Sequence, residues 1–185
     1  MIRAARLVAV LLPLAGLATL WALSDSHYRT GTEWEVPIAG YDPRDVLRGH
    51  YVEFSYAWPG IDEIRDAPPE ALCLAGKAPQ LAAVSVLPAG QPCPHPLRAQ
   101  GSGIYGRDAL MRGRLYVGQQ RAGELQQALQ NPDQRAIVTI RQRADGSFTP
   151  IAIRFRPLTP QEQAARAAQN QGAEGLRPPP PIMAE

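Results

Sequence analysis

The segment around Glu53 carries the two residues best suited to acid–base chemistry. His50 precedes Glu53 by three positions, and an imidazole and a carboxylate within reach of each other can act as general acid and base. Apolar side chains alternate with others from His50 to Trp58, so Tyr51, Glu53 and Ser55 share one face of a predicted strand. His50 and Glu53 are therefore candidates for a functional groove, although the same alternation also explains Glu53 as an ordinary solvent-facing residue.

Serine chemistry is the second enzyme hypothesis. A membrane-anchored, β-rich domain invites comparison with serine proteases that use a Ser–Lys dyad. The chain has a single lysine, Lys77, and Ser85 is the only serine near it in the sequence. The flanking residues lack the pattern of such enzymes, so a solvated pair is the simpler interpretation. An envelope hydrolase that uses His50, Glu53 or Ser85 is therefore an alternative to a non-enzymatic function.

The two cysteines, Cys73 and Cys93, stand 20 positions apart. Together with His95 they offer three zinc ligands, but a closed zinc site needs a fourth ligand that the sequence does not present. An exported chain with two cysteines usually oxidises them. We therefore predict a disulfide between Cys73 and Cys93, no metal site and no cofactor.

The N-terminal segment indicates the compartment. Residues 7–23 form an uncharged, mostly apolar run of 17 residues, at the short end of what a membrane-spanning helix requires. Arg3 and Arg6 precede this run, and positive residues stay on the cytoplasmic side of a bacterial inner membrane. A cleaved signal peptide is the alternative, since Ala22-Leu23-Ser24 supplies small residues where a signal peptidase cuts. Either interpretation predicts a periplasmic domain.

Length, composition and charge limit the number of domains and the class of partner. The length of 185 residues, with 45% hydrophobic and 19% charged residues, fits one globular domain with extensions. Beyond the apolar run the chain carries 17 basic and 17 acidic residues. Because this balance leaves no basic footprint, a nucleic-acid partner is disfavoured.

The patterns predict a fold that is mainly β with minor α (α+β): a small antiparallel β-rich domain with one or two short helices, behind an N-terminal transmembrane helix. We expect an anchor or signal segment over residues 1–25, the β-rich domain over 26–158, and a Gln/Ala-rich helix with a Pro-rich tail over 159–185. Strands are predicted at 32–38, 50–58, 81–87, 97–105, 114–117, 135–143 and 147–155.

Several local signals refine this prediction. Pro37 favours an edge position for the first strand, and residues 60–80 are expected to form a surface loop. Leu125, Ala128 and Leu129 recur at helical spacing within 121–130. Asp145-Gly146 between two β-branched runs predicts a hairpin turn. After Pro160 a weakly amphipathic helix is expected to end at Gly172, before an extended Pro178–Pro181 segment.

Residues 42–49 have the order of a short helix, predicted at 43–48. Asp42 is a favoured N-cap, Pro43 suits the first helical position, and Asp45 and Arg48 lie near the ends whose partial charge they oppose. Gly49 is a favoured terminator. The strand that follows is expected to bury the alternate side chains Val52, Phe54, Tyr56 and Trp58.

The stretch 42–56 resembles the signature of the GDYXXLXY family of membrane-anchored bacterial proteins. Gly49, Tyr51 and Tyr56 match the motif, Phe54 replaces its leucine, and His50 stands at its aspartate. The lead-in Asp42, Pro43, Arg44 and Asp45 is also similar. A second block resembles the family's C-terminal half in the order Arg114–Val117, Gly123–Leu125 and Asp145-Gly146.

The resemblance implies an N-terminal anchor and an extracytoplasmic domain, and it supplies no reaction and no catalytic residues. Our leading hypothesis is therefore a non-enzymatic, membrane-anchored periplasmic accessory module. It would bind or stabilise a multi-pass inner-membrane protein, through an exposed sheet edge or the Pro-rich tail.

Overall fold

The structure is a computed structural model that describes residues 2–42, 51–61, 69–99, 105–118, 121, 124–125, 128 and 131–175. In chain order its elements are α1 (Ile2–Arg29), β1 (Thr32–Asp42), β2 (Tyr51–Tyr56), β3 (Ala71–Lys77), β4 (Gln80–Val86), β5 (Pro96–Arg98), the 3₁₀ helix η1 (Gly106–Leu110), β6 (Arg112–Tyr116), β7 (Gln134–Gln142), β8 (Phe148–Pro157) and α3 (Pro160–Gly175). The predicted class, mainly β with minor α behind an apolar N-terminal helix, is confirmed.

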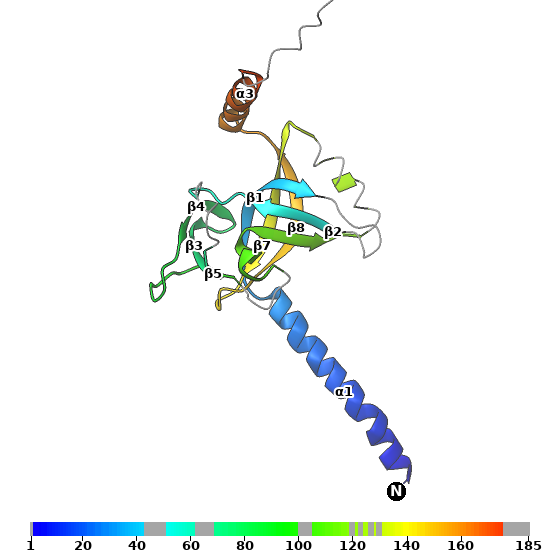
Figure 1. Ribbon diagram of the computed structural model, residues 1–185. Coiled ribbons are helices and arrows are strands. Elements are labelled where there is room, and N and C mark those ends of the chain that lie inside the picture. Colours follow the sequence, from blue (N-terminus) through cyan, green and yellow to red (C-terminus); the bar gives the residue numbers. More distant parts are fainter. Residues whose placement is uncertain are drawn as a thin grey trace, which may run out of the picture.

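The strands form one curled sheet in which β1 is the central strand (Figure 1). Residues Thr32–Pro37 of β1 pair with β7, and residues Ile38–Asp42 pair with β2. β6 continues the sheet beyond β2, β8 continues it beyond β7, and β6 and β8 approach each other. These five strands therefore wrap around the core as an incomplete barrel.

Pro37 lies inside this central strand, so its predicted edge position is wrong. Its carbonyl accepts a hydrogen bond of 2.9 Å from the Ala57 N–H. The reciprocal bond cannot form because proline has no N–H. Pro37 is therefore tolerated where pairing with β2 ends and pairing with β7 takes over.

The hairpin predicted at 135–143 and 147–155 is confirmed as β7 and β8. Gly146 adopts a φ of +85°, which favours glycine. The Asp145 carboxylate accepts a 2.8 Å bond from the Ser147 N–H, and the Arg143 N–H donates to the Ser147 carbonyl across the turn at 2.9 Å. The Asp-Gly pair thus sets this turn as the sequence predicted.

The core collects apolar side chains from both halves of the sheet around Trp34, which is fully buried. The alternate residues predicted for the second strand are all buried: Val52, Phe54 and Tyr56 on β2, and Trp58 just after it. The Trp58 indole donates a 2.6 Å hydrogen bond to the Leu110 carbonyl, which ties η1 to the core. Gly113 of β6 lies directly opposite Phe54, so β6 packs closely against this aromatic layer.

β3 lies within the Pro-rich stretch 60–80, so the prediction of a surface loop is wrong for residues 71–77. β3, β4 and β5 form a small subsheet, which joins β1 through a single parallel pair, Glu35 with Gln80. The predicted disulfide is present: Cys73 on β3 is bonded to Cys93. It ties the segment before β5 to β3, alongside the β3–β5 pairing.

Other elements differ from the prediction in extent. Of the strand expected at 97–105, the described part forms β5 at Pro96–Arg98, Tyr105 lies in a turn before η1, and residues 100–104 lie outside the described residues. The strand expected at 114–117 is β6, from Arg112 to Tyr116. The described residues of 121–130 are helical, as predicted, and α3 ends at Gly175 instead of Gly172. The predicted turn at 43–48 and the Pro178–Pro181 segment lie outside the described residues.

Two arginines of β7 and its turn hold the end of α1. The last carbonyls of a helix have no partner within the helix. Arg143 Nε donates to the His27 carbonyl at 2.9 Å, and Arg141 Nη1 donates to the Tyr28 carbonyl at 2.7 Å. A Cβ on Gly31, whose φ is +135°, would lie 2.5 Å from the Gln142 carbonyl oxygen, so the chain turns tightly from α1 into β1.

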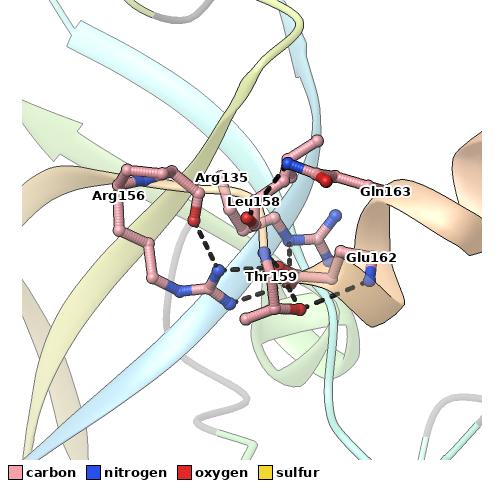
Figure 2. A network of polar contacts seen from close by, with 7 residues as sticks. Arg135, Arg156, Leu158, Thr159, Glu162 and Gln163 are labelled. Atoms are coloured by element: carbon pink, nitrogen blue, oxygen red, sulfur yellow. Dashed lines mark hydrogen bonds and ion pairs between the residues drawn. The ribbon is translucent and has the colours of Figure 1, made fainter.

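The start of α3 is held at the end of the β7–β8 hairpin that lies away from its turn (Figure 2). Thr159 and Glu162 form a capping box: the Thr159 N–H donates to Glu162 Oε2 at 2.9 Å, and the Glu162 N–H donates to Thr159 Oγ1 at 3.3 Å. Arg156 of β8 binds both carboxylate oxygens of Glu162, at 2.6 and 2.8 Å. Arg135 of β7 lies 4.0 Å from the same carboxylate.

Gly113→Ala should destabilise the domain by roughly 1–3 kcal/mol, because an added methyl group overpacks a filled core. The new Cβ would lie 2.5 Å from the Phe54 ring and 2.6 Å from the Tyr56 hydroxyl. Urea unfolding measures the change in the free energy of unfolding. Gly118→Ala is the matched control, since a Cβ there meets nothing within 4 Å. Equal stability of the two variants would contradict this packing.

Glu162 should make the stability of α3 pH-dependent. The Arg156 guanidinium, with further help from Thr159, lowers the pKa of Glu162 to about 2, against about 4.3 in an unfolded chain. A lowered folded-state pKa gives stability that is present above the unfolded pKa and lost as the pH falls towards the folded one. Glu162→Gln should therefore weaken α3 by roughly 0.5–1 kcal/mol at pH 7 and progressively less between pH 5 and pH 2. Amide exchange of residues 163–168 measures this, and a difference that does not change with pH would rule the ion pair out.

Candidate functional site

The two faces of β2 have different roles. Its inward side chains are part of the core, whereas Tyr51 and Glu53 are half-buried and Ser55 is exposed on the outer face. The predicted two-sided strand is therefore confirmed. The outer face is where β2 can present functional groups.

One arginine organises this outer face. Arg114 of β6 lies 3.9 Å from the ring centroid of Tyr51 and 5.7 Å from that of Tyr105. Its Nη2 lies 3.4 Å from Glu53 Oε2. Tyr116 meets Tyr51 edge-on, with the ring centroids 6.1 Å apart. We call these five residues the Arg114 cluster.

Strand register explains why the Arg114 cluster forms. β2 and β6 pair antiparallel, with Tyr51 directly opposite Tyr116 and Glu53 directly opposite Arg114. Side chains directly opposite on one face of a sheet lie about 4.5–5.5 Å apart at their Cβ atoms, and aromatic and opposite-charge pairs there are stabilising. Arg114 is therefore placed between a carboxylate and an aromatic ring by backbone pairing alone.

Tyr105 closes the cluster from the turn before η1. Its hydroxyl is buried and has no hydrogen-bond partner among the described residues. Burial raises the pKa of Tyr105, and the neighbouring Arg114 only partly offsets that effect. Tyr105 therefore stays neutral at physiological pH and adds an aromatic wall to the cluster.

The chemistry available here is recognition. Glu53 is already paired with Arg114, so both groups are committed to each other. Tyr116 is 63% exposed beside them. Tyrosine and arginine are enriched among the residues that dominate the energy of protein interfaces, which makes the Arg114 cluster a candidate contact surface.

The structure separates the residues proposed for catalysis. Ser85 is on β4 and Glu53 is on β2, with β1 between the two strands. Lys77 pairs with Gln80 at the turn of the β3–β4 hairpin, whereas Ser85 pairs with Cys73 further along it. No Ser–Lys dyad is thus assembled from Ser85 and Lys77.

The remaining predicted site residues are not placed by the structure. His50, the partner proposed for Glu53, lies outside the described residues, as do Pro43, Arg44, Asp45 and Gly49. Asp42 is the last residue of β1.

The hypothesis of a zinc site at Cys73, Cys93 and His95 is wrong, because the disulfide uses both sulfur atoms. Among the residues that the structure describes, no group of three or more histidine, cysteine or acidic side chains is placed to hold a metal ion.

Helix α1 is the second candidate site, because its apolar surface is uncovered. Its Ala9–Arg29 stretch is long and apolar enough to cross a membrane, and none of the most apolar window is buried against the domain. Leu12 is 72% and Trp21 is 69% exposed. Transfer of such a surface from water to an apolar environment is favourable.

A comparison with protein families gives one match, in which the model of the GDYXXLXY protein aligns with residues 13–153. The chain belongs to the GDYXXLXY family. Searches of curated proteins and of solved structures found no match. The family match covers most of the chain, from the apolar helix to the second strand of the β7–β8 hairpin.

Within this GDYXXLXY domain the two blocks of resemblance meet in space. Tyr51 comes from the first block, and Arg114 and Tyr116 come from the second. The sequence predicted 114–117 as a strand and as part of the second block of resemblance, but gave no sign that it pairs with the strand of Tyr51. The available signal was that Arg112, Arg114 and Tyr116 occupy alternate positions and so share one face of a strand, but the pairing partner of that strand could not be inferred from it.

A double-mutant cycle between Tyr51 and Arg114 should give a coupling energy of about 0.5–1 kcal/mol, the usual value for a partly exposed cation–π pair. The variants are Tyr51→Leu and Arg114→Met, each of which keeps an apolar stem on the strand. Urea unfolding of the four proteins measures the coupling.

Arg112 provides the matched control for this cycle. It is exposed, lies on the same strand and face two residues away, and pairs with Ser55. The cycle of Tyr51→Leu with Arg112→Met should show no coupling. Equal coupling in the two cycles would refute the specific contact between Tyr51 and Arg114.

Proposed function

We propose that this protein is a membrane-anchored accessory module of the bacterial inner membrane, with its β-rich domain in the periplasm, that binds or stabilises a multi-pass membrane protein. The observation that carries the proposal is an exposed apolar helix held directly on a domain that presents an outward tyrosine–arginine surface.

The anchor part of the proposal rests on α1. Its apolar residues are exposed to a degree that a soluble core helix would not tolerate. Arg3 and Arg6 are the only charges before the apolar run, so the N-terminus is expected in the cytoplasm and the domain in the periplasm. Pro13 and Gly16 are compatible with a membrane helix.

The partner part rests on the Arg114 cluster. Arg112 and Arg114 outnumber Glu53 on the outer face of β2 and β6, so this face favours an acidic partner segment. The Tyr116 ring, which is largely exposed, can pack against that partner. Because the domain is tethered to the membrane, its partner is expected to be a neighbouring membrane protein.

A photo-crosslinking amino acid at position 116 tests this proposal in intact membranes. We expect one adduct with an integral membrane protein, and at least a fivefold loss of that adduct in an Arg114→Met background of unchanged abundance. Position 83, exposed on β4, is the matched control and should give no such adduct. The proposal fails if position 83 gives the same adduct, or if Arg114→Met leaves the yield from position 116 unchanged.

A further inference from the structure

One hairpin holds two of the described helices, α1 and α3. The β7–β8 hairpin binds the end of α1 through Arg141 and Arg143, and it binds the start of α3 through Arg135 and Arg156. We infer that this hairpin is a rigid strut that fixes the position of α3 relative to α1. The inference goes beyond the proposed function, because it concerns the geometry of the protein alone.

The two attachment points lie at opposite ends of the hairpin. Arg135 is near the start of β7, and Arg143 follows its end. A strand rises about 3.3 Å per residue, so these two arginines are separated by roughly 26 Å. α1 and α3 accordingly leave the domain from opposite ends (Figure 1).

Neither helix is joined to the domain by a flexible linker. Two residues, Thr30 and Gly31, connect α1 to β1, and two residues, Leu158 and Thr159, connect β8 to α3. Thr30 donates both its N–H and its hydroxyl to the Ser26 carbonyl, at 3.0 and 2.7 Å. The Leu158 N–H donates to the Asp133 carbonyl at 3.2 Å. These bonds leave the connecting residues little freedom.

The contacts at the α1 end are of a kind that resists bending. Arg143 is only 8% exposed, and a buried cation that loses its partners is costly. Arg141 binds Glu33 at 2.6 Å as well as the Tyr28 carbonyl, and lies 5.5 Å from the Tyr28 ring centroid. Tilting α1 against the sheet would break these bonds together.

The contacts at the α3 end are equally directional. A bidentate arginine–carboxylate pair fixes the orientation as well as the distance, and Arg156 makes such a pair with Glu162. Arg166, one turn further along α3, donates to the Pro132 carbonyl in the segment that leads into β7. The first two turns of α3 are therefore held from both strands of the hairpin.

The strut itself is stiff because β7 is paired on both sides. It pairs with β8 over its whole length and with β1 from Thr32 to Pro37. The consequence is that α3, whose described side chains are mostly exposed, is presented at a set distance and direction relative to the axis of α1. A partner that binds α3 would meet it without an ordering cost.

Pulsed electron spin resonance on the full chain in lipid nanodiscs tests the strut. Spin labels are placed on cysteines introduced at exposed Ser24 of α1, Ala152 of β8 and Ala168 of α3, with the native disulfide kept intact. All three label pairs should give single, narrow distance distributions, no broader than the label's own rotamer freedom. A broad 24–168 distribution in the unmodified background would overturn the inference.

Variants then separate the two attachments. Arg141→Ala should broaden the 24–152 and 24–168 distributions at least twofold and leave 152–168 unchanged. Glu162→Ala should broaden 152–168 and 24–168 and leave 24–152 unchanged. Arg141 is chosen over Arg143 because truncating the buried arginine could unfold the domain.

Arg154→Ala is the matched control, since it removes an ion pair with Glu35 within the sheet and touches neither helix junction. It should leave all three widths unchanged. If Arg141→Ala and Glu162→Ala, each verified as folded by circular dichroism, also leave every width unchanged, these arginine contacts do not hold the helices and the inference is wrong.

Discussion

The buried guanidinium of Arg143 is the constraint on which the arrangement of this protein depends. Its side chain has no carboxylate partner in the described contacts and is satisfied by the His27 carbonyl and the hydroxyls of Ser147 and Thr149. The negative end of the α1 dipole also stabilises the positive charge of Arg143. Helix, strand and turn must therefore be in place together, because the removal of any one would leave a buried charge without its partners.

The charge of Arg114 is compensated in a different way from that of Arg143. It lies on the outer face, where Glu53 and the ring of Tyr51 compensate its charge. This pair is only partly buried and its two charged groups are 3.4 Å apart, so its contribution to stability is modest. We propose that the arrangement serves what the face can bind. Arg143 thus holds helix, strand and turn together, whereas Arg114 gives the outer face of β2 and β6 its charged and aromatic character.

The sequence predicted features that depend on local chemistry and missed those that depend on distant pairing. The Asp145-Gly146 hairpin, the disulfide and the buried face of β2 each follow from turn chemistry, compartment or alternation. β3 was missed because flanking prolines suggested a loop. The central position of β1 could not be foreseen, because a proline in a strand normally indicates an edge. Pro37 is tolerated only because β1 changes from pairing with β7 to pairing with β2 at that residue. The Arg114 cluster was missed for the same reason, because 61 residues separate Glu53 from Arg114.

The spacing of the family motif itself accounts for the two-sided strand. Three positions separate Tyr51 from Phe54, and two separate Phe54 from Tyr56. In a strand an odd spacing places side chains on opposite faces and an even spacing on the same face. Tyr51 is therefore directed outward to Arg114, while Phe54 and Tyr56 pack edge to face in the core, with ring centroids 5.3 Å apart. In this chain the motif therefore places its first tyrosine on the outer face beside Arg114 and commits its last two positions to the core.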